Sequence, residues 1–328
     1  MPNTPARDVP ERALRSLLLG LSHQRVLGRA AVRIPLTRPM VGRFVAGQTL
    51  EEALDAIAVI QAAGYRSAVD VLGESIDSSE MAAAAADRYL ETMDAIAARW
   101  GDGYVSLKLT QMGLDIGHDE VRANLGRILR RAEDLGTFVR IDMEDHTKTD
   151  ATLALWRELR PLHRQTGVVI QAALRRSPAD IEAIIAERGR VRLCKGAYNE
   201  PAGVAYPDKA DVDAAFAALT ERLLMDGEHP AIATHDPALI RHAVRFARQE
   251  RIDRDRFEFQ MLYGVRRDLQ ERLLRAGYRM RVYVPFGSEW YPYFMRRLAE
   301  RPANVLFMAR ALVREGFGRD GQGGGTAS

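Results

Sequence analysis

The sequence is poor in cysteine, in long apolar runs and in excess charge of one sign. Cys194 is its only cysteine in 328 residues, which excludes a disulfide scaffold and suits a reducing cytoplasm. The longest apolar run near the start, Leu17–Leu21, is too short for a signal-peptide core, and no run reaches the length of a membrane span. Basic and acidic residues number 47 and 44 without a polybasic block, so we expect no nucleic-acid partner.

Glycine-rich phosphate-binding motifs are also missing, because neither GxGxxG nor GxxxxGK[ST] occurs. What is present is an ordinary globular composition, with 47% hydrophobic and 28% charged residues. Such a chain can bury a real core, so disorder of the whole chain is excluded. Its length suggests one large domain or two ordinary ones.

The two ends differ from the rest of the chain. Gly316–Ser328 is rich in glycine and predicts a disordered tail, and Met1–Pro10 carries three prolines and should be loose. Pro10–Arg33 has leucines at helical spacing and predicts a helical arm that packs on the main domain, with a membrane-surface or partner-binding helix as the alternative. We therefore divide the chain into a tail and arm (1–50), a catalytic domain (51–315) and a tail (316–328).

Short β-rich apolar runs alternate with helical stretches through the middle of the chain. The eight runs are Ser67–Leu72, Tyr104–Leu109, Thr137–Met143, Val168–Leu174, Arg190–Lys195, Ala231–Thr234, Phe257–Leu262 and Arg279–Val284. The helical stretches are Leu50–Ala63, Ser79–Trp100, Asp119–Leu135, Asp150–Thr166, Pro178–Arg188, Asp211–Asp226, Pro237–Gln249, Arg266–Ala276 and Trp290–Ala299. This alternation predicts an α/β fold with a parallel sheet, and eight units favour a (β/α)8 barrel of the TIM type. The alternative is a doubly wound sheet, which would prefer a glycine-rich turn after an early strand.

Polar side chains occur where the predicted strands end, which is the catalytic face of a barrel. They are Glu74, Lys108, Asp142, Gln171, Arg192, Lys195, Thr234, His235, Gln260 and Tyr283. A buried charge needs a partner, so we expect Lys108 and Asp142, from neighbouring strands, to pair.

Each of these positions also has a purely structural interpretation. Lys108 could belong to a structural ion pair, one acid of Asp142–Asp145 could face solvent, and His235 could be a satisfied core histidine. Cys194 has no histidine at triad spacing nearby and is interpreted as a small core residue. His235 with Asp236 is weak evidence for a metal site.

A cluster of tyrosines and arginines lies on the last predicted helix. Tyr293, Arg296 and Arg297 are spaced to share one helix face. Adjacent arginines can clamp a carboxylate through paired charge-assisted hydrogen bonds. A solvated basic helix end is the alternative.

Several of these segments together resemble the bacterial proline dehydrogenases. The matching segments are Ser106–Gly113, Arg140–Glu144, Val191–Tyr198, Ala233–Asp236, Phe257–Gly264, Tyr283 and the cluster of Tyr293, Arg296 and Arg297. The resemblance covers about Ile34 to Glu315, and Cys194 is its one departure, where the family has an aliphatic residue. It implies a distorted (β/α)8 barrel that binds FAD noncovalently and oxidises L-proline to 1-pyrroline-5-carboxylate, the first step of proline catabolism.

The resemblance also implies partners. Electrons would pass to a membrane quinone, which allows a cytoplasmic enzyme to be peripheral at the inner face of the membrane. The product could be handed to 1-pyrroline-5-carboxylate dehydrogenase. The sequence lacks the extra domains of the bifunctional members, so we expect a monofunctional enzyme, and no metal is implied.

Roles for individual residues follow from the same resemblance. Asp142 and Arg192 are the implied catalytic residues, with Asp142 holding Lys108 and Arg192 beside the flavin N5. The implied substrate-binding residues are Lys108, Arg296 and Arg297 on the carboxylate, Glu74 paired with Arg296, Tyr198 and Tyr283 over the proline ring, and Tyr293 in the cluster with the two arginines. The implied FAD contacts are Met143, Gln171, Arg192, Lys195, Gly196, Ala197, Thr234, His235 and Gln260.

Two other classes of function stay open from the residues alone. A barrel lyase could use Lys108 or Lys195 as a Schiff-base nucleophile without flavin. A non-catalytic binding barrel would keep the arginine pair and show no reduction of flavin by any substrate. The yellow colour of a flavoprotein separates the first of these from a dehydrogenase.

Overall fold

The computed structural model describes residues 41–73, 76–101, 103–161 and 163–300, with only the backbone for 296–300. These residues divide into two compact units, one from Ala46 to Ser288 and one that includes residues 41–45 and 289–300. The predicted arm Pro10–Arg33, the two predicted tails and Glu74 lie outside the described residues. The domain predicted for 51–315 includes a final helix. That helix belongs to the second of these units, and the barrel belongs to the first.

Eight parallel strands form a closed barrel in sequence order, and the last strand pairs with the first. The strands are β1 (Arg66–Val71), β2 (Tyr104–Leu107), β3 (Phe138–Ile141), β4 (Thr166–Gln171), β5 (Arg190–Cys194), β6 (Ala231–Ala233), β7 (Glu258–Leu262) and β8 (Met280–Phe286). The (β/α)8 prediction is confirmed, and the doubly wound alternative is wrong because β1 hydrogen-bonds to both β2 and β8.

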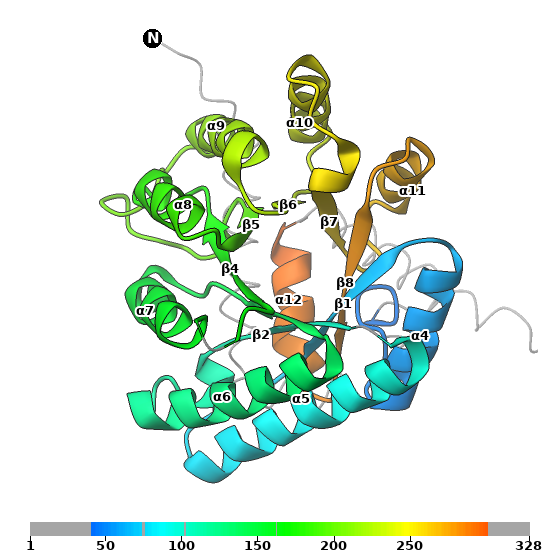
Figure 1. Cartoon of the computed structure of the whole chain (residues 1–328), viewed down its shortest axis with the longest axis vertical. Coiled ribbons are helices and arrows are strands. Elements are labelled where there is room, and N and C mark those ends of the chain that lie inside the picture. Colours follow the sequence, from blue (N-terminus) through cyan, green and yellow to red (C-terminus); the bar gives the residue numbers. More distant parts are fainter. Residues whose placement is uncertain (1–40, 74–75, 102, 162, 301–328) are drawn as a thin grey trace, which may run out of the picture. The chain divides into compact units, whose positions relative to one another are not determined.

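Helices connect the strands and lie outside them (Figure 1). They are α4 (Leu50–Ala62), α5 (Ser79–Trp100), α6 (His118–Leu135), α7 (Thr149–Leu159), α8 (Ser177–Ala186), α9 (Lys209–Asp226), α10 (Pro237–Gln249) and α11 (Arg267–Arg275). Short 3-10 helices are η2 (Thr110–Met112), η3 (His146–Lys148) and η4 (Arg254–Arg256). Among the described residues, no helix is both long enough and apolar enough to cross a bilayer.

The helix predicted for Asp150–Thr166 is too long. The strand predicted after it therefore begins and ends too late in the sequence. Helix α7 ends at Leu159, and Thr166 is the first residue of β4 rather than the end of a helix. Pro161 explains the early end, because a proline has no backbone N–H with which to continue the hydrogen-bond ladder of the helix. Strand β4 therefore ends at Gln171, three residues before the predicted end at Leu174.

The aliphatic core lies between the strands and the helices. Leu107 of β2, Leu125 of α6 and Trp156 of α7 are completely buried in it. Burying a side chain of this size contributes about 1.5–3 kcal/mol, so this layer is the main source of stability. The barrel can therefore hold polar side chains in its interior without losing its core.

The interior of the barrel is charged. Arg140 of β3, Arg192 of β5 and Arg281 of β8 are buried or nearly so. Arg192 Nε donates to Gln260 Oε1 on β7 at 2.5 Å, and its Nη1 donates to Ser106 Oγ on β2 at 3.0 Å. Neither β2 nor β7 neighbours β5 in the sheet, so these hydrogen bonds cross the inside of the barrel.

The second compact unit contains helix α12 (Trp290–Glu300). The ring of Phe294 lies 5.7 Å from Trp290 and 6.2 Å from Phe44, measured between ring centroids. Trp290, Tyr293 and Phe294 are buried. The helix predicted for Trp290–Ala299 is confirmed to within one residue.

Gly167 on β4 makes room for the buried guanidinium of Arg140. A methyl group added at Gly167 would lie 2.6 Å from Arg140 Nη1 and 2.5 Å from the carbonyl oxygen of Arg190. We expect Gly167→Ala to lower the free energy of unfolding by about 1–3 kcal/mol, the usual cost of overpacking. Urea unfolding measures this change.

Gly203→Ala is the matched control, because a methyl group there meets no atom within 4 Å. Equal stability of Gly167→Ala and the control would contradict the assignment of Gly167 as the glycine that admits Arg140.

Candidate active site

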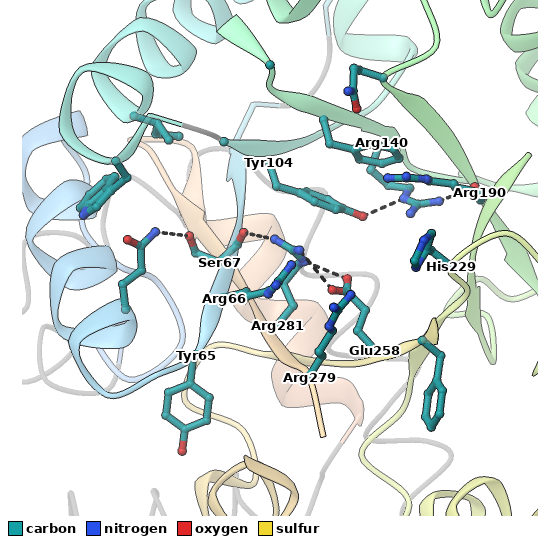
Figure 2. Close-up of a pocket in the computed structure, with 18 of the residues that line it drawn as sticks. Tyr65, Arg66, Ser67, Tyr104, Arg140, Arg190, His229, Glu258, Arg279 and Arg281 are labelled. Atoms are coloured by element: carbon teal, nitrogen blue, oxygen red, sulfur yellow. Dashed lines mark hydrogen bonds and ion pairs between the residues drawn. The ribbon is translucent and has the colours of Figure 1, made fainter. Parts of the chain in front are cut away.

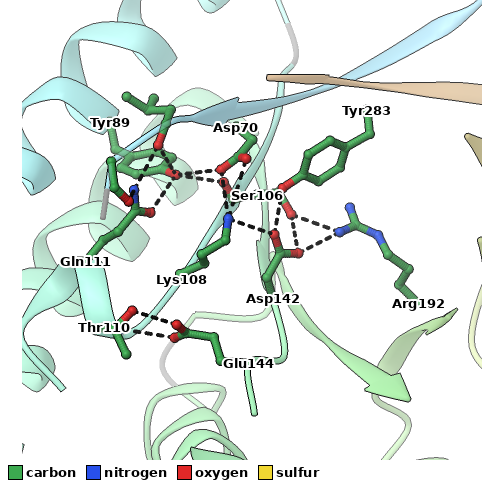
Figure 3. A network of polar contacts seen from close by, with 12 residues as sticks. Asp70, Tyr89, Ser106, Lys108, Thr110, Gln111, Asp142, Glu144, Arg192 and Tyr283 are labelled. Atoms are coloured by element: carbon green, nitrogen blue, oxygen red, sulfur yellow. Dashed lines mark hydrogen bonds and ion pairs between the residues drawn. The ribbon is translucent and has the colours of Figure 1, made fainter. Parts of the chain in front are cut away.

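A polar network occupies the barrel where β1, β2, β3, β5 and β8 approach their carboxyl ends (Figure 3). Asp142, the residue directly after β3, is its centre. Its carboxylate accepts hydrogen bonds from Ser106 Oγ at 2.7 Å, Arg192 Nη1 at 2.6 Å and Tyr283 Oη at 2.7 Å. Three other strands thus contribute to the position of this one carboxylate.

The predicted pairing of Lys108 with Asp142 is confirmed, but Asp142 is not the nearest acid. Lys108 Nζ lies 3.7 Å from Asp142 Oδ2 and 3.3 and 3.4 Å from the two carboxylate oxygens of Asp70. Asp70 lies on β1 and is completely buried. The sequence analysis missed this residue, although a single acid inside the apolar run Ser67–Leu72 was a signal for it.

Two buried side chains surround the end of β1 that carries Asp70. Tyr89 of α5 donates through its hydroxyl to the carbonyl oxygen of Ser106 at 2.9 Å and lies 3.4 Å from Asp70 Oδ1. Gln111 donates to the carbonyl oxygens of Val71 and Gly73 at 2.9 and 2.6 Å. The ammonium of Lys108 is therefore fixed by a carboxylate that is itself held in place.

The two acids of the network have opposite pKa shifts. Burial raises the pKa of Asp70 above its usual value, more than Lys108 lowers it. Burial alone would also raise the pKa of Asp142, but the Arg192 and Lys108 cations outweigh it and hold that pKa below the usual range. Asp142 is thus the acid that keeps its negative charge to lower pH.

Tyr283 is a neutral hydrogen-bond donor in this network. Burial, and then the charges of Asp142 and Asp70, raise the pKa of Tyr283 well above the usual value of a phenol. Its hydroxyl consequently keeps its proton and donates a hydrogen bond to Asp142. The ring lies 5.2 Å from the guanidinium carbon of Arg192, within the range of a cation–π contact.

Arg192 is the most connected cation of the site. Burial would lower the pKa of Arg192, but its interactions with Tyr104 and Asp142 raise it above its ordinary value. Its Nη2 is buried and has no hydrogen-bond partner among the described residues. A buried donor of this kind is costly unless a ligand or water accepts its proton.

The residues after β5 form an exposed turn next to this network. Lys195 Nζ is paired with Asp213 of α9 and lies 2.9 Å from Asp236 Oδ2, the N-cap of α10. Gly196 has a φ of +109°, which favours glycine, and a methyl group there would lie 3.2 Å from both Ala173 Cβ and Gln171 Oε1. Ala197 and Tyr198 follow on the surface.

The other predicted cofactor residues surround the same end of the barrel. Met143 and Thr234 are buried, and Gln171 donates through Nε2 to the carbonyl oxygen of Glu144 at 2.8 Å. His235 Nε2 lies 2.9 Å from the backbone nitrogen of Leu262, so this ring nitrogen accepts the hydrogen bond. His235 therefore has the structural role that the sequence left open, and its contact with a cofactor stays a prediction.

Two further expectations concern the lysines and Cys194. Carboxylates surround both Lys108 and Lys195, which stabilises the ammonium form, whereas a Schiff-base nucleophile must be a neutral amine. Burial raises the pKa of the Cys194 thiol to about 11, in agreement with a packing residue.

The described residues contain no group of three or more His, Cys, Asp or Glu side chains that could hold a metal ion.

The predicted carboxylate clamp of Arg296 and Arg297 is only partly among the described residues. Tyr293 is buried on α12, in the second compact unit. The side chains of Arg296 and Arg297 and all of Glu74 lie outside the described residues. Their roles stay predictions.

Comparison with known proteins agrees with this arrangement. The model of the proline dehydrogenase family matches residues 53–310. The chain belongs to the proline dehydrogenase family. It is 42% identical to the proline dehydrogenase of Deinococcus radiodurans over 279 residues, 83% of this chain and 89% of that protein. It is 39% identical to proline dehydrogenase 1 of Bacillus subtilis over 302 residues, 92% of this chain and 100% of that protein.

Solved structures show the same fold. The crystal structure of proline utilization A from Bdellovibrio bacteriovorus, inactivated by N-propargylglycine, superposes with a TM-score of 0.74 at 27% identity. The match covers 80% of this chain and 32% of that larger protein. The alternatives of a flavin-free lyase and of a non-catalytic binding barrel are not supported by these relatives.

The contact between Arg192 and Asp142 leads to a prediction about stability. Removing one partner of a buried ion pair costs about 3–5 kcal/mol, so Arg192→Met should lower the free energy of unfolding by that amount at pH 7. An acid whose folded pKa is depressed stabilises the fold above its unfolded pKa of about 4 and loses this contribution at lower pH. Without Arg192, burial should raise the pKa of Asp142.

The destabilisation caused by Arg192→Met should therefore be largest at pH 7 and shrink as the pH falls toward about 4. Urea unfolding of both proteins across this range measures it. Adding Asp142→Asn to Arg192→Met should recover part of the loss at pH 7. A destabilisation that is the same at every pH, with no recovery in the double variant, would refute the assigned ion pair.

Proposed function

We propose that this protein oxidises L-proline to 1-pyrroline-5-carboxylate, the first step of proline catabolism, with FAD as cofactor and a membrane quinone as electron acceptor. Membership of the proline dehydrogenase family is the observation that carries the proposal. The network around Asp142 supports it, because it combines fixed cations, a neutral phenol and a buried anion at the catalytic face of the barrel.

Proline dehydrogenases use a flavin, and the residues after β5 suit one. Gly196 leaves space that a side chain would fill, which lets a ring system approach the backbone beside Gln171. The buried Nη2 of Arg192 is a donor in need of an acceptor. We assign FAD contacts to the predicted set: Met143, Gln171, Arg192, Lys195, Gly196, Ala197, Thr234, His235 and Gln260.

The flavin supplies a hydride acceptor, and the chain orients the substrate and balances charge. Lys108, with Arg296 and Arg297, would bind the substrate carboxylate through charge-assisted hydrogen bonds. The amine must lose its proton before hydride leaves the carbon beside it, so a cation such as Lys108 nearby favours the reactive neutral form. Arg192 supplies a fixed positive charge that can offset negative charge gained on the flavin.

Asp142 has a positioning role in this proposal. It fixes Lys108, Arg192 and the hydroxyl of Tyr283 relative to one another, and its low pKa keeps it anionic throughout. Tyr283 and Tyr198 would pack over the proline ring and hold it at near-attack distance, and Tyr293 would belong to the substrate-binding cluster with Arg296 and Arg297. Glu74 would pair with Arg296.

The proposed partners follow from the chemistry of the products. A quinone is dissolved in the bilayer, so we propose a cytoplasmic protein that meets the inner face of the membrane peripherally. We propose that 1-pyrroline-5-carboxylate dehydrogenase consumes the product.

One prediction of this proposal concerns the cofactor and the substrate. Purified protein should carry about one FAD per chain, identified by chromatography after release by heat, and anaerobic L-proline should bleach its absorbance. A cyclic carboxylate without the ring nitrogen should bind without bleaching. A colourless protein that does not take up added FAD would refute the proposal, and FMN in place of FAD would refute only the cofactor.

Another prediction of this proposal concerns the carboxylate clamp of Arg296 and Arg297. Arg296→Met and Arg297→Met should each raise the KM for proline roughly ten- to hundredfold, because each loses a bond of about 1.5–3 kcal/mol. The flavin spectrum should not change. Arg130→Met, on an exposed position of α6 without a described partner, is the control. Steady-state kinetics equal to wild type in both clamp variants would return α12 to the interpretation of a solvated helix end.

A further inference from the structure

The opposite end of the barrel contains a cavity of about 680 Å³ (Figure 2). Its walls come from residues at which strands begin, among them Arg66 of β1, Tyr104 of β2 and Arg190 of β5. The candidate active site lies where the strands end. Arg190, at the start of β5, and Lys195, just past its end, are five positions apart, about 16 Å at roughly 3.3 Å per residue.

The cavity has a large excess of positive charge. Among the described residues, five arginines and one acid, Glu258, line it. The arginines are Arg66, Arg140, Arg190, Arg279 and Arg281. In Figure 2, Arg66, Arg279 and Arg281 lie on one side and Arg140 and Arg190 on the other.

Only part of this charge is neutralised by the protein. Arg281 forms a two-pronged pair with Glu258, with nitrogen–oxygen distances of 2.8 and 3.1 Å. Arg279 pairs with Asp255 at 2.8 Å, an acid that does not line the cavity and is mostly exposed. Among the described residues, the guanidinium groups of Arg66 and Arg190 have no hydrogen bond or ion pair.

Arg140 adds a buried cation without a carboxylate in contact. Its guanidinium donates to Tyr104 Oη at 2.8 Å and to the carbonyl oxygens of Val168 and Arg190 at 2.9 and 2.5 Å. None of these acceptors is a carboxylate, and burial together with the Arg192 cation lowers the pKa of Arg140. Arg140 and Arg190 both lie near the ring of Phe138, at 4.9 and 5.3 Å from its centroid.

Like charges held around a cavity repel one another, and an anion in the cavity would relieve that repulsion. Arginine suits this role because its planar fork binds carboxylate and phosphate oxygens in pairs. A single oxyanion would neutralise only part of the excess, and the volume suits a metabolite rather than one ion.

We propose that this cavity is a binding site for a small polyanion, a metabolite with two or more phosphate or carboxylate groups, held by Arg66 and Arg190 over the buried charge of Arg140. The site is separate from the proposed flavin chemistry, and its occupation does not require that chemistry.

Isothermal titration of the purified protein at low ionic strength tests the proposal, with inorganic pyrophosphate and citrate as separate probes. Wild type should bind at least one of them, and binding should weaken as salt rises. Pyrophosphate alone would indicate a phosphate ester, citrate alone a polycarboxylate, and both a site that accepts either group. No binding of either probe would overturn the proposal.

Variants locate the binding on the protein. Arg190→Gln and Arg66→Gln should each weaken binding about tenfold or more, since each removes a charge-assisted contact, and Arg190→Lys should retain part of the affinity. Arg130→Gln, an exposed arginine on α6, should bind as wild type does. Both variant positions reach solvent, and circular dichroism checks that each variant folds.

Unchanged affinity in both Arg190→Gln and Arg66→Gln would also overturn the proposal, because the probe would then occupy another site. The measurement distinguishes this failure from failure of the proposed function. The titration contains no proline, so the heat of probe binding and its dependence on Arg190 do not require proline oxidation. A protein that does not oxidise proline would still bind the probe if the proposed site exists.

Discussion

The hydrogen-bonded ion pair between Arg192 and Asp142 is the contact on which the interior of this barrel depends. It joins β5 to the end of β3, with a nitrogen–oxygen distance of 2.6 Å. The same two side chains also reach Ser106, Gln260 and Tyr283 on three other strands. A charge buried alone would be too costly to keep, so each member of this network exists because the others are present. Its arrangement is therefore fixed before any ligand binds.

This network changes what the barrel interior can do. A barrel filled by aliphatic side chains is a packed core, whereas this one holds its aliphatic layer outside the strands and its charges inside. Preorganised charges in a buried site act more strongly on a reacting group than charges in water, and they need no rearrangement during the reaction. The active-site chemistry proposed for the Asp142 end uses that property for hydride transfer from proline.

The two ends of the barrel differ in how their charges are balanced. Near the ends of the strands, Asp70 and Asp142 face Lys108 and Arg192, so acids and bases are matched. At the beginnings of the strands, arginines outnumber acids, and Gly167 has no side chain where Arg140 needs space. The matched end suits catalysis by fixed dipoles and charges, and the unmatched end suits recognition of an anion.

The sequence by itself determined the alternation of strands and helices, because side-chain periodicity is a local property, and its eight units favoured a barrel over a doubly wound sheet. It also predicted which polar residues follow the strands, including the pair of Lys108 and Asp142. Tertiary structure alone decided the partners. Asp70 looked like part of an apolar strand, and Tyr283 meets Asp142 from 141 positions away. The arginines at the strand beginnings are scattered from residue 66 to residue 281 and form one cavity only when the barrel closes.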